Sequence, residues 1–250
     1  EIVPLKVANY HDLDAVMKDK EHHMYVDQPD VERPSKIYID NRSCQSDKTK
    51  SELDLLKDFF DLSLQTTTAS TGETAGHNLL NSHVHGARNL DFILQSDVSP
   101  KKYTTWTSIG GNNNVDNPNT DDADEALPNG QCFEGNLHGD GHTISGLTSS
   151  LFAHFCGEAY NLGVTGSFAT SGIADEGSGY LENCWVKSSN TTDAKTSKPI
   201  FGNPITDSWS GARTIHMVNC YYPSENKFTA HGSASYGLPI EKPLKAFNDG

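Results

Sequence analysis

The chain has 250 residues, 35% hydrophobic content and a formal net charge of −14. This length allows one large domain or two small ones, with a sizeable buried core. The acidic balance disfavours nucleic acid as a partner, because phosphate contacts need clustered Lys and Arg. No run of 18 apolar residues occurs, so the sequence predicts no membrane insertion. We recognise no signal peptide, and we expect a mature form or an excised piece of a larger multidomain chain.

Residues 1–87 predict an N-terminal capping region with strands and one helix. The apolar runs Ile2–Val7 and Ile37–Ile39 are typical of short strands. Ser51–Leu64 is the best helical segment, because Ser51 can cap it, Asp54 follows three residues later, and the apolar residues fall on one face. We expect this helix to close an open end of the β structure that follows.

Residues 88–250 contain four short apolar strings that can be placed in one register. The middle position of the strings is Gly146, Asn161, Asn183 and Asn219. Two residues earlier stand Ile144, Ala159, Leu181 and Met217, and one residue later stand Leu147, Leu162, Cys184 and Cys220. Positions separated by three residues cannot both face inward on a straight strand, because side chains alternate with period 2. The chain must therefore bend at the middle residue.

Gly and Asn are the residues that best tolerate the left-handed backbone of such a corner. Corners repeated in register predict stacked coils, and the corners are separated by 15, 22 and 36 residues. We therefore expect an all-β fold, a right-handed parallel β-helix (solenoid), with extra residues looped out between coils. An ordinary all-β sandwich with similar turns is the alternative.

The Gly-rich part of this region also resembles a known family. Phe133-Glu-Gly135 leads to Gly139-x-Gly141-His-Thr-Ile-Ser-Gly146-Leu, and Asn161-Leu-Gly-Val and Glu182-Asn-Cys-Trp-Val follow. These strings resemble the GLUG-motif β-helical repeat of bacterial surface and secreted proteins, and the resemblance covers roughly residues 88 to 222. It implies a β-helical fold and a non-catalytic role at an extracellular or bacterial cell-surface location. His138 replaces the acidic residue expected before Gly139, and the strings after Val186 fit the repeat poorly.

Two polar excursions interrupt the strings, at residues 112–129 and 188–213. The first is acidic, but it lacks the spacing of a Ca²⁺ loop. The second contains Trp209 and a possible short strand at Ile200-Phe-Gly202. The five cysteines fit no zinc motif. Cys184 and Cys220 share a register position, so we expect interior packing, although a disulfide between them is also compatible with the sequence.

Histidines and carboxylates are the candidates for chemistry. His83 and His85 alternate, as do His138, Asp140 and His142, but neither group shows the three or four converging ligands of a metal site. No metallopeptidase, nucleophile-elbow or phosphate-loop motif occurs, so we expect no cofactor and assign no catalytic residue. Asp140, Asp175, Glu176 and Glu182 keep a carbohydrate-active enzyme, a polysaccharide lyase or glycoside hydrolase, as the alternative function.

The leading hypothesis is a module for adhesion, or for binding a glycan or a host or surface protein. Its expected contact residues are Trp185, Trp209, Tyr221 and Lys187. Trp185 and Tyr221 lie between inward positions of their strings, so we expect them to point outward on successive coils. Outward aromatic rings would form a stacking platform for sugars or protein side chains. The competing expectation is that the 188–213 loop folds over these rings and hides them.

Overall fold

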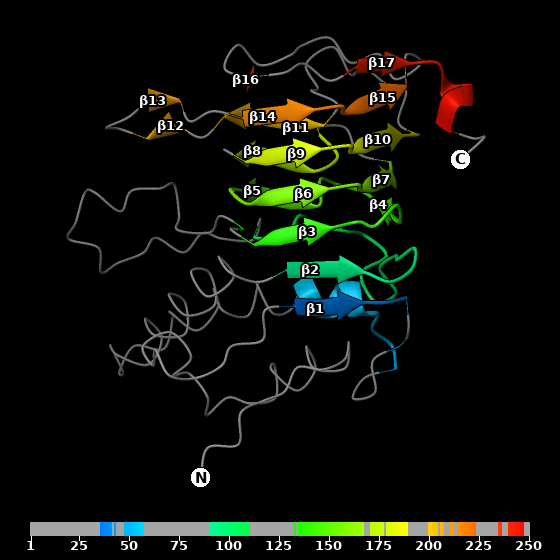
Figure 1. Cartoon of the computed structure of the whole chain (residues 1–250). Coiled ribbons are helices and arrows are strands. Elements are labelled where there is room, and N and C mark those ends of the chain that lie inside the picture. Colours follow the sequence, from blue (N-terminus) through cyan, green and yellow to red (C-terminus); the bar gives the residue numbers. More distant parts are fainter. Residues whose placement is uncertain are drawn as a thin grey trace, which may run out of the picture.

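A computed structural model describes the chain in segments: 36–41, 43, 48–57, 91–110, 133, 135–167, 171–177, 179–189, 200–204, 206–207, 211–212, 215–223, 235–236 and 240–247. The expected strand Ile2–Val7, the first excursion (112–129) and Trp209 all lie outside these segments. Over the described residues the fold is all-β and its sheets are mostly parallel (Figure 1).

Three parallel sheets make up the structure. Sheet I contains β1 (Lys36–Ile39), β2 (Asp91–Leu94), β3 (Asn136–His138), β6 (Glu158–Tyr160), β9 (Tyr180–Glu182), β14 (Ile215–Val218) and β16 (Ser235–Tyr236) in that order. Sheet II contains β4 (Thr143–Leu147), β7 (Gly163–Gly166), β10 (Trp185–Ser188), β15 (Tyr221–Pro223) and β17 (Ile240–Lys242). Sheet III contains β5 (Phe152–Phe155), β8 (Ala174–Gly177) and β11 (Phe201–Pro204).

From β3 to β11, consecutive strands of the chain lie in different sheets. The chain passes from β3 to β4 to β5, then from β6 to β7 to β8, then from β9 to β10 to β11, and each passage visits sheets I, II and III in the same order. We call one such passage a circuit. Each circuit pairs in parallel with the circuit before it, so the strands are stacked (Figure 1). A small antiparallel hairpin, β12 (Thr206–Asp207) and β13 (Gly211–Ala212), stands apart from the stack.

The corner between sheets I and II carries the predicted asparagine column. Asn161, Asn183 and Asn219 have left-handed φ angles of 50°, 54° and 51°. The Asn183 side-chain amide donates to Asn161 Oδ1 at 3.0 Å, and the Asn219 amide donates to Asn183 Oδ1 at 3.3 Å. Three of the four predicted corner residues are therefore confirmed.

The assignment of Gly146 to this corner is wrong. The left-handed residues at this corner of the circuit are Asp140 and Gly141, with φ of 51° and 85°. The Gly139 and Gly141 amides bond across to Tyr160 and Asn161, so this circuit turns the corner with extra residues. Gly146 is also left-handed, but it lies at an irregularity near the end of β4, where the β4–β7 register shifts.

The interior columns of apolar residues also match the prediction in the later circuits and differ from it in the first. One buried column consists of successive register partners on sheet I: Leu137, Ala159, Leu181 and Met217. A second, fully buried column has its residues one circuit apart: Leu162, Cys184 and Cys220. The predicted places of Ile144 and Leu147 are wrong, because Ile144 pairs with Val164 and Leu147 with Gly166. Both described thiols, Cys184 and Cys220, are free, whereas Cys156 is disulfide-bonded.

Aromatic side chains fill the interior where sheets I and III face each other. Phe133 stacks on Phe152 with ring centroids 4.5 Å apart and lies 5.4 Å from Phe92. Phe155 joins the same cluster and meets Phe201 edge-on at 6.1 Å. Phe201 begins β11, so the expected short strand in the second excursion is confirmed, and it shares a register row with Ala174 and Phe152.

A helix at residues 52–57 packs against the β1 and β2 end of the stack (Figure 1). Leu53, Leu55 and Leu56 are buried in the same core as the strands, in agreement with the predicted capping helix. Its predicted continuation to Leu64 lies outside the described residues. β1, from the predicted capping region, pairs in parallel with β2. The domain boundary between residues 87 and 88 stays a prediction.

Candidate binding faces

Trp185 and Tyr221 are direct register partners on neighbouring strands of sheet II. Each begins its strand, is flanked in sequence by two buried residues and is itself half-buried, so both rings project from the outer face of the sheet. The Trp185 indole lies over Gly163, where an added Cβ would come within 2.4 Å of Trp185 Cζ2. Glycine at position 163 therefore makes room for the indole ring.

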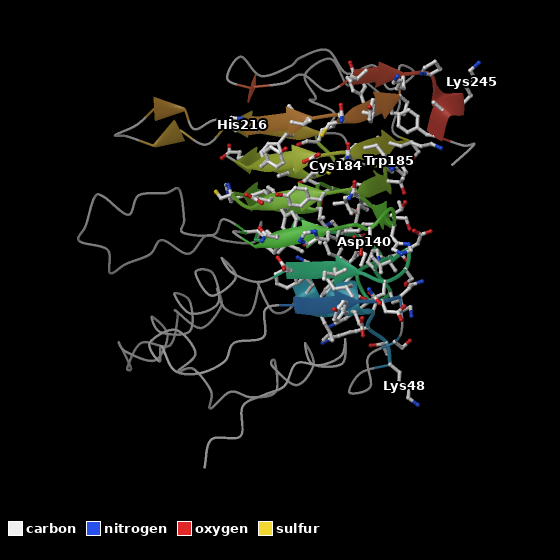
Figure 2. The ribbon with its side chains drawn as sticks, in the orientation of Figure 1. Lys48, Asp140, Cys184, Trp185, His216 and Lys245 are labelled. Atoms are coloured by element: carbon white, nitrogen blue, oxygen red, sulfur yellow. The ribbon has the colours of Figure 1, made fainter. Side chains whose placement is uncertain are left out.

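The C-terminal segment partly covers this pair. The 3-10 helix η6 (Leu244–Phe247) brings Phe247 to 5.7 Å from the Trp185 ring, and Lys242 Nζ lies 5.5 Å above the Tyr221 ring. Figure 2 shows Trp185 and Lys245 at this end of the molecule. Lys187, also half-buried, is two residues beyond Trp185 on β10. The structure brings three of the expected contact residues to one sheet, with the Trp185 and Tyr221 rings partly covered.

A second set of residues, which the sequence interpretation missed, occupies the outer face of sheet I. Glu158 and Tyr160 on β6 lie opposite Tyr180 and Glu182 on β9, so that each glutamate faces a tyrosine across the strands. Ala159 and Leu181 between them point into the core. The four outward side chains form a two-by-two arrangement, which we call the tyrosine–glutamate face.

Hydrogen bonds within each strand connect this arrangement. The Tyr160 hydroxyl donates to Glu158 Oε2, and the Tyr180 hydroxyl donates to Glu182 Oε2 at 2.9 Å. The bond to Glu158 and its charge, with some burial, raise the pKa of Tyr160 well above its usual value. The bond to Glu182 raises the pKa of Tyr180 in the same way. Both phenols therefore stay protonated at neutral pH, with their protons directed at carboxylates.

The face continues over the neighbouring strands of sheet I. The His138 ring stacks on Tyr160 at 5.3 Å with an interplanar angle of 15°, and Tyr160 lies 5.8 Å from Tyr180. Asp91 Oδ1 accepts from the Asn136 amide at 2.9 Å and lies 3.5 Å from His138 Nε2. We call the whole outer surface the ladder face: Asp91, Asn136, His138, Glu158, Tyr160, Tyr180, Glu182 and His216. Figure 2 shows side chains along these strands, with His216 labelled on β14.

No family model, curated protein or solved structure matches this chain. The geometry of the two faces is therefore the basis for a proposed function.

One sequence signal could have located the ladder face. The strings Glu158-Ala-Tyr160 and Tyr180-Leu-Glu182 are mirror images around an inward apolar residue. Inward and corner positions alone do not show this symmetry. Aligning the outward positions as well would have paired each tyrosine with a glutamate.

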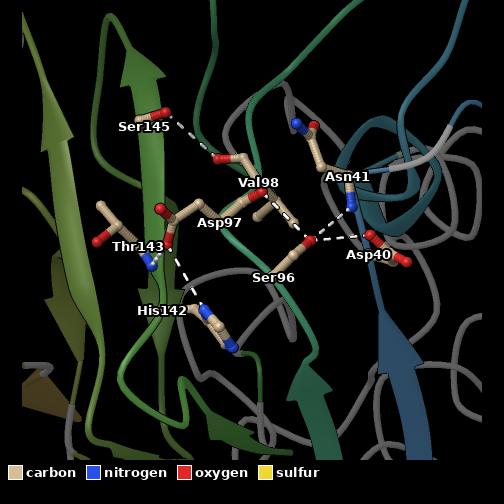
Figure 3. A network of polar contacts seen from close by, with 8 residues as sticks. All are labelled: Asp40, Asn41, Ser96, Asp97, Val98, His142, Thr143 and Ser145. Atoms are coloured by element: carbon tan, nitrogen blue, oxygen red, sulfur yellow. Dashed lines mark hydrogen bonds and ion pairs between the residues drawn. The ribbon is translucent and has the colours of Figure 1, made fainter.

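A polar network ties three segments together near the corner of sheets I and II (Figure 3). Ser96 Oγ donates to Asp40 Oδ1 at 2.8 Å and accepts from the Asn41 amide. Asp97 Oδ1 accepts from the Thr143 amide at 2.8 Å and lies 3.7 Å from His142. These contacts join β1, β2 and β4 to one another, which is a structural role.

The remaining described candidates do not converge on one site, and His83 and His85 lie outside the described residues. His138 and His142 contact different aspartates, Asp91 and Asp97. Asp175 and Glu176 lie on β8 of sheet III, where Glu176 is 3.6 Å from His154 Nδ1. Within the described segments no group of three His, Cys, Asp or Glu side chains has the arrangement of a metal site. Nor does any described helix have the length and apolar character needed to cross a membrane.

Proposed function

We propose that this chain is a right-handed parallel β-helix module of a bacterial cell-surface or secreted protein, and that it binds a glycan without cleaving it. The repeated circuit through three parallel sheets supports the solenoid, since each strand pairs with its counterpart one circuit away. The asparagine column supports it further, because three circuits turn the same corner with the same residue type. An extended stack of this kind offers long flat faces to a polymer.

The observation that carries the binding function is the ladder face. Its tyrosine and histidine rings run across three neighbouring strands and are flanked by carboxylate, amide and imidazole groups. Rings supply apolar contact area at low entropic cost, and the polar groups between them supply directional hydrogen bonds. A sugar ring presents the same combination of apolar C–H surfaces and hydroxyl groups. The face is therefore suited to a chain of sugar residues lying across the strands.

A glycan array with the intact chain tests this proposal. We expect binding that is lost when Tyr160 and Tyr180 are both replaced by Ala and retained when Trp185 is replaced by Ala. The opposite pattern would move the site to the Trp185 and Tyr221 pair on sheet II. Binding to a protein with no glycan signal would show that the module is an adhesin for protein partners.

A carbohydrate-active enzyme is the second candidate, and the tyrosine–glutamate face is the feature that favours it. Glu158 and Glu182 lie diagonally on neighbouring strands, with Cα atoms about 8 Å apart from the strand spacing and rise. Both carboxylates influence the pKa of both tyrosines, so the four groups form one electrostatic unit. Glycoside hydrolysis uses a pair of carboxyl groups that flank the scissile bond. Release of reducing ends that stops in a Glu158→Gln variant would establish this function in place of pure binding.

A further inference from the structure

The charge of the ladder face points to a particular class of glycan. The strands β2, β3, β6, β9 and β14 contain no Lys or Arg, and their outward carboxylates are Asp91, Glu158 and Glu182. The ion pairs seen among the described residues join histidines to Asp91, Asp97 and Glu176, and none involves Glu158 or Glu182. A uronic acid or sulfated polymer would be repelled here, and the chain's net charge of −14 adds to that repulsion.

The hydrogen-bonding capacity of the face leads to the same conclusion from a different observation. The hydroxyl protons of Tyr160 and Tyr180 are already donated to Glu158 and Glu182. The phenol oxygens and the remaining carboxylate lone pairs are therefore left as acceptors toward solvent. A ligand that fits this surface must supply donors. An ammonium group has three donors and no acceptor, whereas an acetamide adds a carbonyl that finds few donors there.

We infer that the ligand of the ladder face is an amino-sugar glycan with free, protonated amines. The inference rests on the proposed glycan-binding function and narrows its ligand. The amines would lie between Glu158 and Glu182, each making a charge-assisted bond to a carboxylate oxygen, while the sugar rings contact the exposed parts of Tyr160 and Tyr180. N-acetylated glycans of the same linkage would bind more weakly, and uronate glycans more weakly still.

Calorimetry with three oligosaccharides of equal length tests the inference: a β-linked glucosamine hexamer, its fully N-acetylated form and a hexuronate. We expect the free-amine hexamer to bind about tenfold or more tightly than the acetylated one, the fold-change of one charge-assisted hydrogen bond. Its affinity should fall as ionic strength rises toward 1 M, where the screening length is only about 3 Å.

A matched pair of double variants separates local recognition from overall charge. Glu158→Gln with Glu182→Gln removes two charges from the ladder face, and Asp175→Asn with Glu176→Gln removes two charges from sheet III. We expect the first variant to erase the preference for the free amine and the second to keep it.

Equal affinity for the amine and acetylated hexamers would overturn the inference and leave glycan binding intact, and so would tighter binding of the hexuronate. Binding of oligolysine in the absence of any sugar binding would also overturn it, because the face would then dock a basic protein segment. If neither the three oligosaccharides nor oligolysine bound, the glycan-binding function itself would fail.

Discussion

At the scale of single residues, the corner asparagines combine a backbone and a side-chain role. Asn183 has φ of 54° and its amide group stands between those of Asn161 and Asn219. Replacing Asn183 by Ala should lower the free energy of unfolding by about 1–2 kcal/mol, because Ala tolerates the left-handed backbone poorly. Urea denaturation measures this change.

Asn183→Gly is the control for that prediction. Glycine adopts the left-handed backbone freely but cannot continue the amide ladder, so it should cost less than Ala. If the Ala variant were as stable as the Gly variant, the backbone would not be the source of the cost.

Tyr160 makes a pH-dependent contribution with a definite sign. Its pKa is raised in the folded state by Glu158, so the stabilisation is fully present below the unfolded value of about 10 and is lost as pH rises through the higher folded pKa. We expect the free energy of unfolding to fall more steeply at alkaline pH for the native chain than for Tyr160→Phe. Ultraviolet titration of the Glu158→Gln variant should show one phenol ionising at a lower pH than in the native chain. An unchanged titration would contradict the assigned cause.

At the scale of elements, the helix at 52–57 is joined to the sheets through one buried carboxylate. Asp54 Oδ2 accepts from the Ser51 amide at 2.7 Å and from the Lys101 and Lys102 amides at 2.8 and 3.0 Å. The Asp54 backbone amide in turn donates to Ser51 Oγ, which completes the reciprocal cap expected from the sequence. Replacing Asp54 by Ala should lower the free energy of unfolding by about 2–3 kcal/mol, since several donors lose a charged acceptor.

Asp97→Ala is the matched control for Asp54. Asp97 is 73% exposed and accepts from one described backbone amide, so its loss should cost less than about 1 kcal/mol.

Burial raises the pKa of Asp54, but the bonds from Ser51, Lys102 and Lys101 outweigh burial and lower it overall. Its stabilisation is therefore present above about pH 3.9 and lost as pH falls through the lower folded pKa. An Asp54→Asn variant with the same acid profile as the native chain would contradict this.

The elements also show what sequence can and cannot predict here. The columns at Ala159, Leu181 and Met217 were predictable, because apolar alternation and a corner Asn recur at fixed positions. The first circuit was misaligned, because Asp140 and Gly141 add residues to its corner and Gly146 offers a similar glycine further along the chain. The pairing of Tyr160 with Glu182 follows from the same register as that of Ala159 with Leu181. The hydrogen bonds of each tyrosine to the glutamate of its own strand depend on side-chain conformations, which sequence spacing does not reveal.

At the scale of the whole molecule, stability should follow the order of the stack. β6 lies between β3 and β9, whereas β16 follows β14 at the end of sheet I with two paired residues. Since each strand gains its hydrogen bonds from the circuits on either side, opening should begin at the ends of such a stack. Native-state hydrogen exchange should therefore show the slowest amides in β6 and β9 and faster exchange in β16 and β17.

Replacing Phe152 by Ala probes how far this stability is shared. Phe152 is fully buried between Phe133 and Phe155, so its removal should cost about 3–5 kcal/mol. Because the aromatic cluster links β2 of sheet I to β5 and β11 of sheet III, we expect exchange to accelerate in both of these sheets. Val218→Ala, at a position that is 40% exposed, should leave the exchange pattern unchanged. Acceleration confined to β5 would show that the circuits unfold independently. A long ligand-binding face would then lack the common rigid support that the proposed function requires.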